Sequence, residues 1–306
     1  MAPVHGVGRA AAFAAAAEDV VDDLAAGHGY EAAVVSRMTD RTWTGLAARS
    51  GGRATSVGRV LPVEHTACHH LLVDHWPVVE RDLHQHADPA LRSVAERYGV
   101  SAYGGAALLG PDGRRLGSVY GYSSDARDDV DADRFATRLA VAAADLGRRL
   151  TSALEAAADE RRAAHDRARA SADGVTGLPD RRGWGLFLQE EGVRAGRLGE
   201  DMSVVLLDVG LVRTVRGVRR AGDVLREALG DLGVSRVSGR QFGVVAGGPG
   251  DADPAEVAAT AQAALRAAGY TATSGWALRD PLEGAVGTWW RAEDALLRVR
   301  AATAAG

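Results

Sequence analysis

Three residue types are absent from this chain of 306 residues: it contains no lysine, no asparagine and no isoleucine. All 36 of its basic residues are therefore arginine. We interpret the absences as the mark of a GC-rich genome that avoids AT-rich codons. An arginine in place of a lysine then carries little functional meaning, whereas a lost aspartate or glutamate carries more, because the codons of these acids can be GC-rich.

Cysteine and long apolar runs are also scarce. The single cysteine, Cys68, excludes an intrachain disulfide framework and indicates a reducing cytoplasm. No run of about eighteen strongly apolar residues occurs, so we expect no transmembrane helix. The alanine-rich N-terminus lacks the apolar core and cleavage site of a signal peptide.

The composition describes an ordinary globular protein. A net charge of −4 gives no support for a nucleic-acid binder. With 46% hydrophobic and 25% charged residues, the chain can bury a core. Its 306 residues are enough for two domains.

In the first half, an alanine-rich pattern over 8–26 predicts a helix that stops at glycines. Strand-like runs, a short helix over 64–75 and a helix capped by Asp88 follow. Two more strand-like runs flank the turn sequence PDGR, and a charged helical pattern covers 131–171. This order predicts an α+β fold with an antiparallel sheet.

The long helix carries apolar residues at 4-3-4 spacing, namely Leu146, Leu150, Ala153 and Ala157. Such spacing is that of a weak coiled-coil seam, and we expect it to join two copies in a parallel homodimer. An ordinary solvated connector helix is the alternative. We expect a solvated face from the arginines that follow, Arg161, Arg162, Arg167 and Arg169.

The second half alternates strands and helices in a βαββαβ-type order, which predicts a ferredoxin-like sheet with helices on one face. Its first strand is a buried apolar run that ends in Asp208. The stretch SRVSGRQFGVV, residues 235–245, predicts a hairpin whose tip lies beside Asp208 in the same sheet. A carboxylate at the end of a strand, next to a hairpin, is a setting in which enzymes hold metals over a triphosphate.

These motifs resemble those of the GGDEF, or diguanylate cyclase, domain over about 173–303. DGVTGLPDRR is similar to the family's opening motif D-x-L-T-G-L-x-N-R, and AEDALLRVR to its closing helix. Asp208 takes the place of the family's first metal-binding aspartate. Asp223 takes the place of an aspartate that contacts guanine. SGRQF, at 238–242, lies where the GGDEF signature belongs.

The departures from the family fall on its chemistry. The resemblance implies condensation of two GTP molecules, with Mg²⁺, into cyclic di-GMP, for which the signature acids bind metal and activate a hydroxyl. Here the signature consists of Ser238, Gly239, Arg240, Gln241 and Phe242. Arginine would repel a metal ion, and glutamine lacks the charge of a strong ligand for a hard cation. We therefore expect no catalytic residue in the signature.

Other positions weaken the site further. Gly210 stands where a second strand-end aspartate is usual, and Arg216 falls near the guanine-binding asparagine. The chain between Asp208 and Ser238 is shorter than usual, and it holds no R-x-x-D after Asp223, so product inhibition is not expected. Asp208 is the candidate metal ligand, and Mg²⁺ and GTP are cofactors only if the site is functional. Asp223 and Arg240 are the candidate nucleotide-binding residues, the latter because guanidinium suits phosphate oxygens.

The first half, about 8–145, resembles a GAF domain, a cytoplasmic sensor module. HTACHHLLVDHWPVVERDL is similar to that family's helix and strand around a common cysteine, and SAYGGAALLGPDGRRLGSVYGY to its central hairpin. We expect a pocket closed by the hairpin 101–124 and the helix 64–75, which takes a small organic ligand or none. Cys68 with nearby histidines forms the alternative, a metal or haem site. Those histidines are His65, His69, His70 and His75.

We predict a GAF sensor domain over 1–145, a signalling helix over 146–172 and a degenerate GGDEF domain over 173–306. The function expected is cytoplasmic signal transduction in a bacterium, through conformational change or contact with a protein partner. The partners expected are a second copy, an unknown small ligand at the GAF domain and a protein, with no nucleic acid and no membrane. Two alternatives stay open: an active diguanylate cyclase, and a dimerisation scaffold without a ligand.

Overall fold

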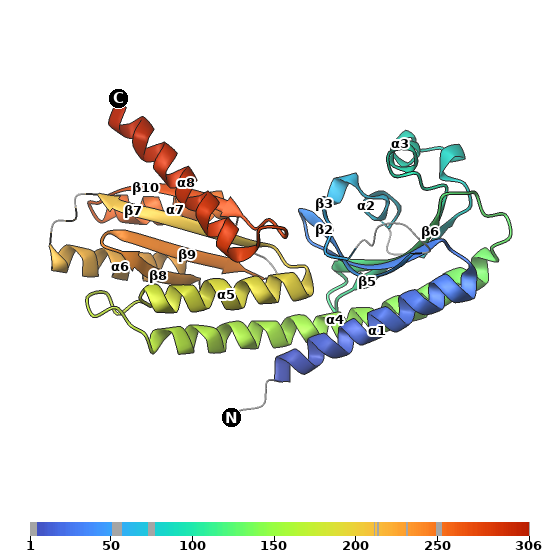
Figure 1. Cartoon of the computed structure of the whole chain (residues 1–306), viewed down its shortest axis with the longest axis horizontal. Coiled ribbons are helices and arrows are strands. Elements are labelled where there is room, and N and C mark those ends of the chain that lie inside the picture. Colours follow the sequence, from blue (N-terminus) through green and yellow to red (C-terminus); the bar gives the residue numbers. More distant parts are fainter. Residues whose placement is uncertain are drawn as a thin grey trace. The chain divides into compact units, whose positions relative to one another are not determined.

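The computed structural model describes residues 5–50, 57–72, 77–210, 212, 214–230, 232–248 and 253–305 (Figure 1). By its internal contacts the chain divides into two compact units. The first unit comprises residues 1–157 with 197–199, and the second comprises 158–196 with 200–306. The division falls within one unbroken helix, α4 (Ala132–Arg169).

A six-stranded sheet forms the centre of the first unit among the described residues. Its strands are β1 (Ala32–Met38), β2 (Thr42–Ser50), β3 (Val60–Pro62), β4 (Val78–Glu80), β5 (Ala102–Leu109) and β6 (Arg115–Ser123). They lie in the order β3-β2-β1-β6-β5-β4, and every neighbouring pair is antiparallel. The predicted antiparallel sheet is confirmed.

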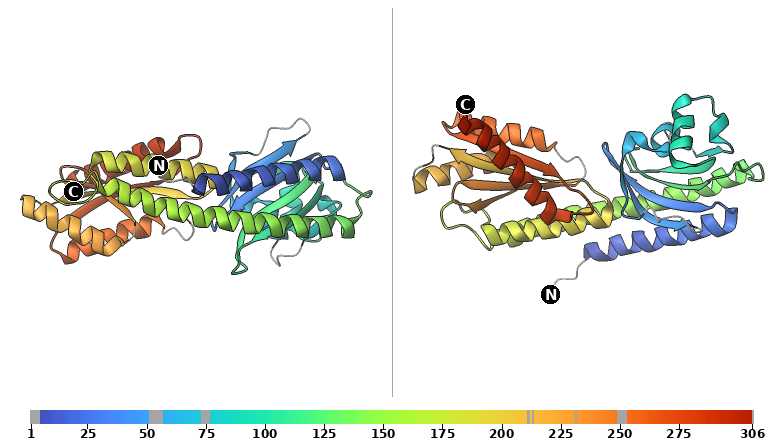
Figure 2. Two further views of the ribbon diagram at one scale, coloured as in Figure 1. Left: turned by 90° about the horizontal axis from the view of Figure 1, so that it is seen from below. Right: turned by 45° about the horizontal axis from the view of Figure 1, so that its top comes forward.

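Helices cover both faces of this sheet (Figure 2). They are α1 (His5–His28), α2 (Ala67–Leu71), α3 (Pro89–Tyr98) and the first part of α4, with short 3-10 turns at Val63–His65 and Leu83–Gln85. On β1, Ala33 and Val35 pack with α1 and α4, whereas Val34 and Met38 pack with α2 and α3. A strand buried on both faces takes a continuous apolar run, which explains the sequence AAVV in β1.

Helix α3 begins and ends where its sequence predicts. The Asp88 side chain accepts a hydrogen bond from the Ala90 backbone N–H at 2.8 Å, and Pro89 occupies the first turn. Gly99 follows with φ +61°, a left-handed conformation that glycine adopts without a Cβ penalty. The predicted cap and stop are therefore confirmed.

The apolar seam of α4 is buried inside the first unit. Leu146, Leu150, Ala153 and Ala157 all belong to its hydrophobic core and are at most 1% exposed. The expectation that they face a second copy is therefore wrong for this structure. The same spacing also suits a helix that packs on its own domain, because residues three and four apart share one helix face.

The helix expected over 64–75 is interrupted. Val63–His65 forms a 3-10 turn, Thr66 is extended, and α2 begins at Ala67. His65 and His69 thus do not lie on one continuous helix, as the expected helix over 64–75 would have placed them. Within the described ranges, no group of three or more His, Cys, Asp or Glu side chains could hold a metal ion. His75 lies outside the described residues.

The second unit contains a four-stranded antiparallel sheet in the described segments. Its strands are β7 (Met202–Gly210), β8 (Gly233–Ser238), β9 (Gln241–Gly247) and β10 (Thr271–Leu278). They lie in the order β10-β7-β9-β8. With a helix after β7 and another after β9, this is the predicted ferredoxin-like βαββαβ arrangement.

Helices cover both faces of this second sheet, so the expectation of helices on one face is wrong. They are α5 (Arg181–Leu198), α6 (Val215–Leu229), α7 (Pro254–Ala267) and α8 (Gly284–Ala305). On β7, Val205 and Leu207 pack with α6 and α7, whereas Val204 and Leu206 pack with α5 and α8. The second layer forms because α5 precedes the βαββαβ segment and α8 follows it.

Candidate functional site

The hairpin of strands β8 and β9 presents the SGRQF residues at its tip. Gly239 has φ +30° within this tight turn, and Gln241 lies directly opposite Asp208 in the register of β9 with β7. The backbone N–H of Val209 donates to the Arg240 carbonyl at 3.1 Å. The predicted juxtaposition of Asp208 with the hairpin tip is confirmed.

The carboxylate of Asp208 lies between two arginines. Its Oδ1 is 3.7 Å from Nε of Arg240 at the hairpin tip, and its Oδ2 is 3.3 Å from Nη1 of Arg300 in α8. The Asp208 side chain is 13% exposed, whereas both arginine side chains are 50% exposed. A cation at this carboxylate would have to compete with two guanidinium groups.

An open cleft of about 600 Å³ surrounds Asp208. Arg266 of α7 lines it together with Arg240, Arg300 and Gly210. Asp208 is the only acid among the described residues of this lining, so three cationic side chains oppose one anionic side chain. Such a cleft attracts anions rather than cations.

The residues around Asp208 do not fit a two-metal site for phosphoryl transfer. Such a site needs several carboxylates to hold its cations. Gln241 accepts a hydrogen bond from the Ser238 hydroxyl at 3.2 Å and carries no charge. Phe242 is buried in the core beneath the hairpin, and Gly210 has no side chain. Among the described residues of the cleft, the only carboxylate that could bind a metal ion is therefore that of Asp208, which is paired with two arginines.

Asp223 has different surroundings. It lies on α6, its side chain is 55% exposed, and it pairs with Arg226 at 3.2 Å. Arg226 also donates to the Thr176 carbonyl at 2.8 Å. Asp223 is not among the described residues that line the cleft. The structure thus does not bring together Asp223 and Arg240 as lining residues of one described pocket.

The opening motif DGVTGLPDRR holds the hairpin in place. Asp173 accepts hydrogen bonds from the Thr176 backbone N–H and hydroxyl, each at 2.9 Å. Both of its carboxylate oxygens also accept from Nη1 of Arg236 at 2.9 Å. Arg236 also donates to the Gly239 carbonyl at 2.8 Å. Burial raises the pKa of Asp173, but the bonds from Thr176 and Arg236 outweigh it and lower that pKa overall. The motif therefore fixes the hairpin tip through Arg236.

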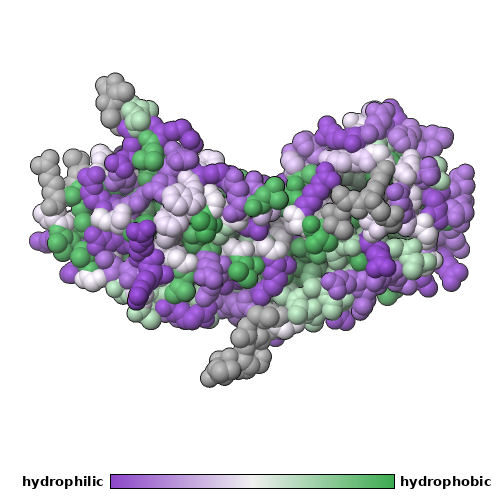
Figure 3. All heavy atoms as spheres, in the orientation of Figure 1, coloured by the Kyte–Doolittle hydropathy of each residue, from purple (hydrophilic) through white to green (hydrophobic). Residues whose placement is uncertain are grey.

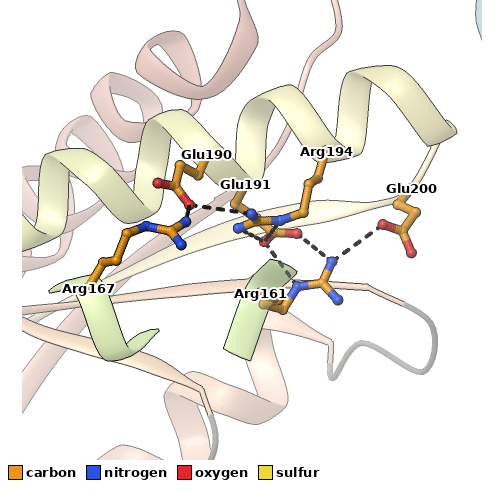
Figure 4. A network of polar contacts seen from close by, with 6 residues as sticks. All are labelled: Arg161, Arg167, Glu190, Glu191, Arg194 and Glu200. Atoms are coloured by element: carbon orange, nitrogen blue, oxygen red, sulfur yellow. Dashed lines mark hydrogen bonds and ion pairs between the residues drawn. The ribbon is translucent and has the colours of Figure 1, made fainter. Parts of the chain in front are cut away.

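Sequence reasoning missed a buried ion-pair network between α4 and α5 (Figure 4). Arg161, expected on a solvated face, is 18% exposed and donates to Glu191 at 2.7 and 3.0 Å and to Glu200 at 3.3 Å. Arg194 contacts the same Glu191 carboxylate at 2.9 Å. The i, i+3 spacing of Glu191 and Arg194 was the available signal. The assignment of Arg161 to solvent was wrong because α5 covers it.

The outer members of this network are more exposed. Arg167 pairs with Glu190 at 2.7 Å, and its side chain is 56% exposed. Burial raises the pKa of Glu191, but the ion pairs with Arg161 and Arg194 outweigh it and lower that pKa overall. The network therefore joins the C-terminal part of α4 to α5 through charges that are largely withdrawn from water.

The first unit contains a smaller cavity of about 120 Å³ between the sheet and α2. Tyr103, Tyr120 and Tyr122 of the 102–123 hairpin line it, together with Cys68, Trp43 and Arg59. The hairpin and the segment around Cys68 thus both line the cavity, as predicted. Burial raises the pKa of the Cys68 thiol, which accepts a hydrogen bond from the Tyr103 hydroxyl at 3.4 Å.

No family model matches the chain, and no curated protein matches it. Among solved structures, it is similar to the GGDEF domain of DgcB from Caulobacter crescentus in complex with c-di-GMP. That likeness has 21% identity and a TM-score of 0.39, and it covers 44% of this chain and 89% of the other. A second likeness is to diguanylate cyclase SiaD in complex with its activator SiaC from Pseudomonas aeruginosa, at 21% identity, a TM-score of 0.40 and coverage of 56% and 75%.

The chain is also similar to the PixJ GAF-domain from Thermosynechococcus elongatus in its blue-light absorbing form. Here the identity is 14%, the TM-score is 0.37 and the coverage is 46% of this chain and 88% of the other. The structural neighbours thus include both GGDEF and GAF domains. None of the helices in the described part of the chain combines the length and apolarity that a membrane crossing requires.

Proposed function

We propose that this chain is a signal-transduction protein with a GAF-type sensor in its first unit and a catalytically degenerate GGDEF-type domain in its second. The observation that carries the proposal is the pairing of Asp208 with Arg240 and Arg300. This carboxylate is the only acid in the described cleft lining. Phosphoryl transfer with two metal ions requires several anionic ligands, and here the charge of the Asp208 carboxylate is already balanced by arginine.

The output proposed is a conformational change or a contact with a protein partner, without catalysis. Helix α4 supports this proposal, because it begins in the first unit and continues unbroken into the second. Its C-terminal part is joined to α5 by the Arg161 and Glu191 pair. A conformational change in the sensor part of α4 would therefore act on a helix whose C-terminal part is held against α5.

We further propose that the protein works in the cytoplasm as a homodimer, without nucleic acid or membrane contact. Because the α4 seam is buried, the contact between copies would use other surfaces. Large apolar side chains stay exposed in the second unit, and apolar spheres lie among polar ones on its face in Figure 3. They include Trp276, Leu282, Val286, Trp290 and Leu297. Light scattering at micromolar concentration that shows a strict monomer would contradict the dimer.

An assay of the full chain with GTP and Mg²⁺, with products identified by mass, tests the degenerate site. We expect no cyclic di-GMP. Magnesium-dependent turnover that disappears in Asp208→Ala would instead establish an active diguanylate cyclase. Nucleotide binding measured in parallel separates a nucleotide-dependent output from a scaffold that binds no ligand.

A double variant sharpens the assay. Arg240→Asp with Gln241→Glu restores two acids at the hairpin tip, yet we expect at most weak turnover, because Ser238, Gly210 and Arg300 are unchanged. Full activity in this variant would show that the signature alone had limited the chemistry. No activity in either form supports the proposal.

A further inference from the structure

Strand β10 lies at one side of the second sheet, and its outer edge is not paired with any strand of the described residues. Its eight residues, TATSGWAL, include no charged residue and no proline, and its pairing with β7 contains no bulge. Proteins commonly use charges, proline or bulges to stop an edge strand from pairing with another chain. The edge of β10 therefore lacks the usual protection against the addition of a strand.

The register of β10 shows which of its backbone groups point outward. The Arg279 N–H donates to the Met202 carbonyl at 2.7 Å, one step beyond the pair of Leu278 with Ser203. Hydrogen-bonded and non-hydrogen-bonded pairs alternate along an antiparallel ladder, so the odd positions of β10 bond to β7. The N–H and C=O groups at the even positions, 272 to 278, therefore point away from the sheet, where a further strand would bond.

Among the described residues, side chains bond to this outer edge at its two ends. Gln262 of α7 donates to the Ala272 carbonyl at 3.0 Å, and Arg291 of α8 donates to the Leu278 carbonyl at 2.5 Å. Both bonds agree with the outward direction of the even positions. Between them, around Ser274, no described residue outside the sheet bonds to the outward backbone groups. The middle of the edge is therefore open to another strand.

The cleft around Asp208 lies beside the first half of this edge. Residues 271–273 line it together with Arg266 of α7, Arg300 of α8 and Arg240 of the hairpin. Because α7 and α8 cover opposite faces of the sheet, successive side chains of an added strand would meet Arg266 and Arg300 in turn. Arg266 is exposed, and no described residue forms an ion pair with it. Consecutive acidic side chains would thus find a cationic partner on each face.

The charge of the cleft distinguishes between two kinds of chain that would suit this edge. A second copy of β10 brings no acid to the arginines, because TATSGWAL contains none. An acidic segment supplies both the backbone groups of a strand and the carboxylates that guanidinium groups bind. The described lining carries three arginines against the single acid Asp208. The cleft therefore favours an acidic partner over a second copy.

We propose that the outer edge of β10 binds an extended acidic segment of a partner protein, which adds as a further strand and whose carboxylates pair with Arg266 and Arg300. The proposal rests on the partner-binding output proposed above, and it names the surface and the chemistry of that partner. Peptide binding to the full chain tests it, whereas the GTP assay tests turnover. The failure of either proposal is therefore visible separately.

Fluorescence anisotropy of dye-labelled peptides with the full chain measures this binding. The capped peptide EEVTVTVEE reads the same in both directions, so it suits either orientation of an added strand. We expect it to bind at least about tenfold more tightly than RRVTVTVRR. N-methylation of its valines blocks one edge of the peptide and N-methylation of its threonines blocks the other, so only one of the two should abolish binding.

Three variants locate the binding site. Arg266→Glu should weaken EEVTVTVEE about five- to tenfold, because it removes one ion pair and adds a repulsion. Arg220→Glu is the matched control, since Arg220 is an exposed arginine of α6 outside the described cleft lining, and it should change the affinity less than about twofold. Ser274→Pro removes an outward N–H that does not bond to β7, and it should abolish binding.

Four results would overturn the proposal. The first is that EEVTVTVEE does not bind at millimolar concentration or binds no better than RRVTVTVRR. The second is that both N-methylated peptides bind, or that neither does. The third is an equal effect of Arg266→Glu and Arg220→Glu. The fourth is a dimer that Ser274→Pro converts to a monomer while peptide binding persists, which would assign the edge to a second copy. Thermal unfolding shows whether each variant folds, and the two arginine variants decide the outcome if Ser274→Pro does not.

Discussion

The cavity of the first unit and the cleft of the second offer opposite surroundings to a ligand. The cavity is small and is lined by four tyrosines and a tryptophan. The cleft is open and lined by three arginines, and the one acid among its described lining residues is already paired. One site is thus largely aromatic, whereas in the other the single acid of the described lining is already paired with arginine.

The same contrast extends to the cores around the two sites. In the first unit, the buried ionisable groups near the cavity are neutral tyrosines and a thiol. In the second, buried carboxylates are held by arginines, as Glu191 is by Arg161 and Arg194. Neutral buried groups resist ionisation, whereas paired buried charges resist neutralisation. The two units should therefore lose stability at opposite extremes of pH.

The largest effect expected comes from breaking the buried network. Glu191→Ala leaves Arg161 and Arg194 without their shared partner and should destabilise the second unit by about 3–5 kcal/mol. Asp159→Ala is the matched control in α4, since its pair with Arg162 is exposed and should contribute about 0–1 kcal/mol. Urea unfolding followed by tryptophan fluorescence measures both. An equal decrease in the free energy of unfolding in the two variants would mean that burial of the network contributes nothing to stability.

Extremes of pH should separate the two units. Burial raises the pKa of Tyr30 in the first unit to about 12 and raises those of Tyr103 and Tyr120 well above their usual value. A raised pKa gives stability that is complete below about pH 10, the unfolded value, and that is lost as the pH rises through the folded value. The first unit should therefore unfold in alkali, at a pH where absorbance reports tyrosinate.

The carboxylates of the second unit behave in the opposite way. The pKa values of Glu191 and Asp173 are lowered overall, so their stability is present above about pH 4 and is lost as the pH falls through the folded values. Tyr30→Phe should reduce the alkaline loss and leave the acid loss unchanged. The contrast between the units would be wrong if Tyr30→Phe changed the alkaline and the acid loss of stability by similar amounts.

The smallest effect sharpens the comparison at the cleft. Asp208→Ala frees Arg240 and Arg300, so inorganic pyrophosphate should bind at least about fourfold more tightly without Mg²⁺. Removing one unit charge about 5 Å away in water gives about 0.8 kcal/mol for each charge of the ligand. With Mg²⁺ present, a site that holds pyrophosphate through a metal on Asp208 would lose affinity in the same variant, so the sign of the change measured with Mg²⁺ decides. Asp223→Ala, outside the described cleft lining, should have no effect. The gain should fade at high salt.

Local sequence predicted several features of the fold and the candidate site. Asp88, Pro89 and Gly99 bound α3 because caps and stops act within a single turn of helix. The neighbourhood of Asp208 and Gln241 followed from an apolar strand and a hairpin that share one sheet. The second layer on the ferredoxin-like sheet was missed, because nothing in a βαββαβ pattern says where the helices before and after it will pack.

The sequence by itself determined the order of the elements, the SGRQF tip and the replacement of the signature acids by Arg240 and Gln241, because these depend on residue identity and short spacing. Only the tertiary structure decided which charges are paired. It brought Arg300 of α8 to Asp208, covered Arg161 with α5 and buried the α4 seam in the first unit. Such contacts join residues far apart in the chain, and the helical period that exposes a face to solvent is the same one that buries it against a sheet.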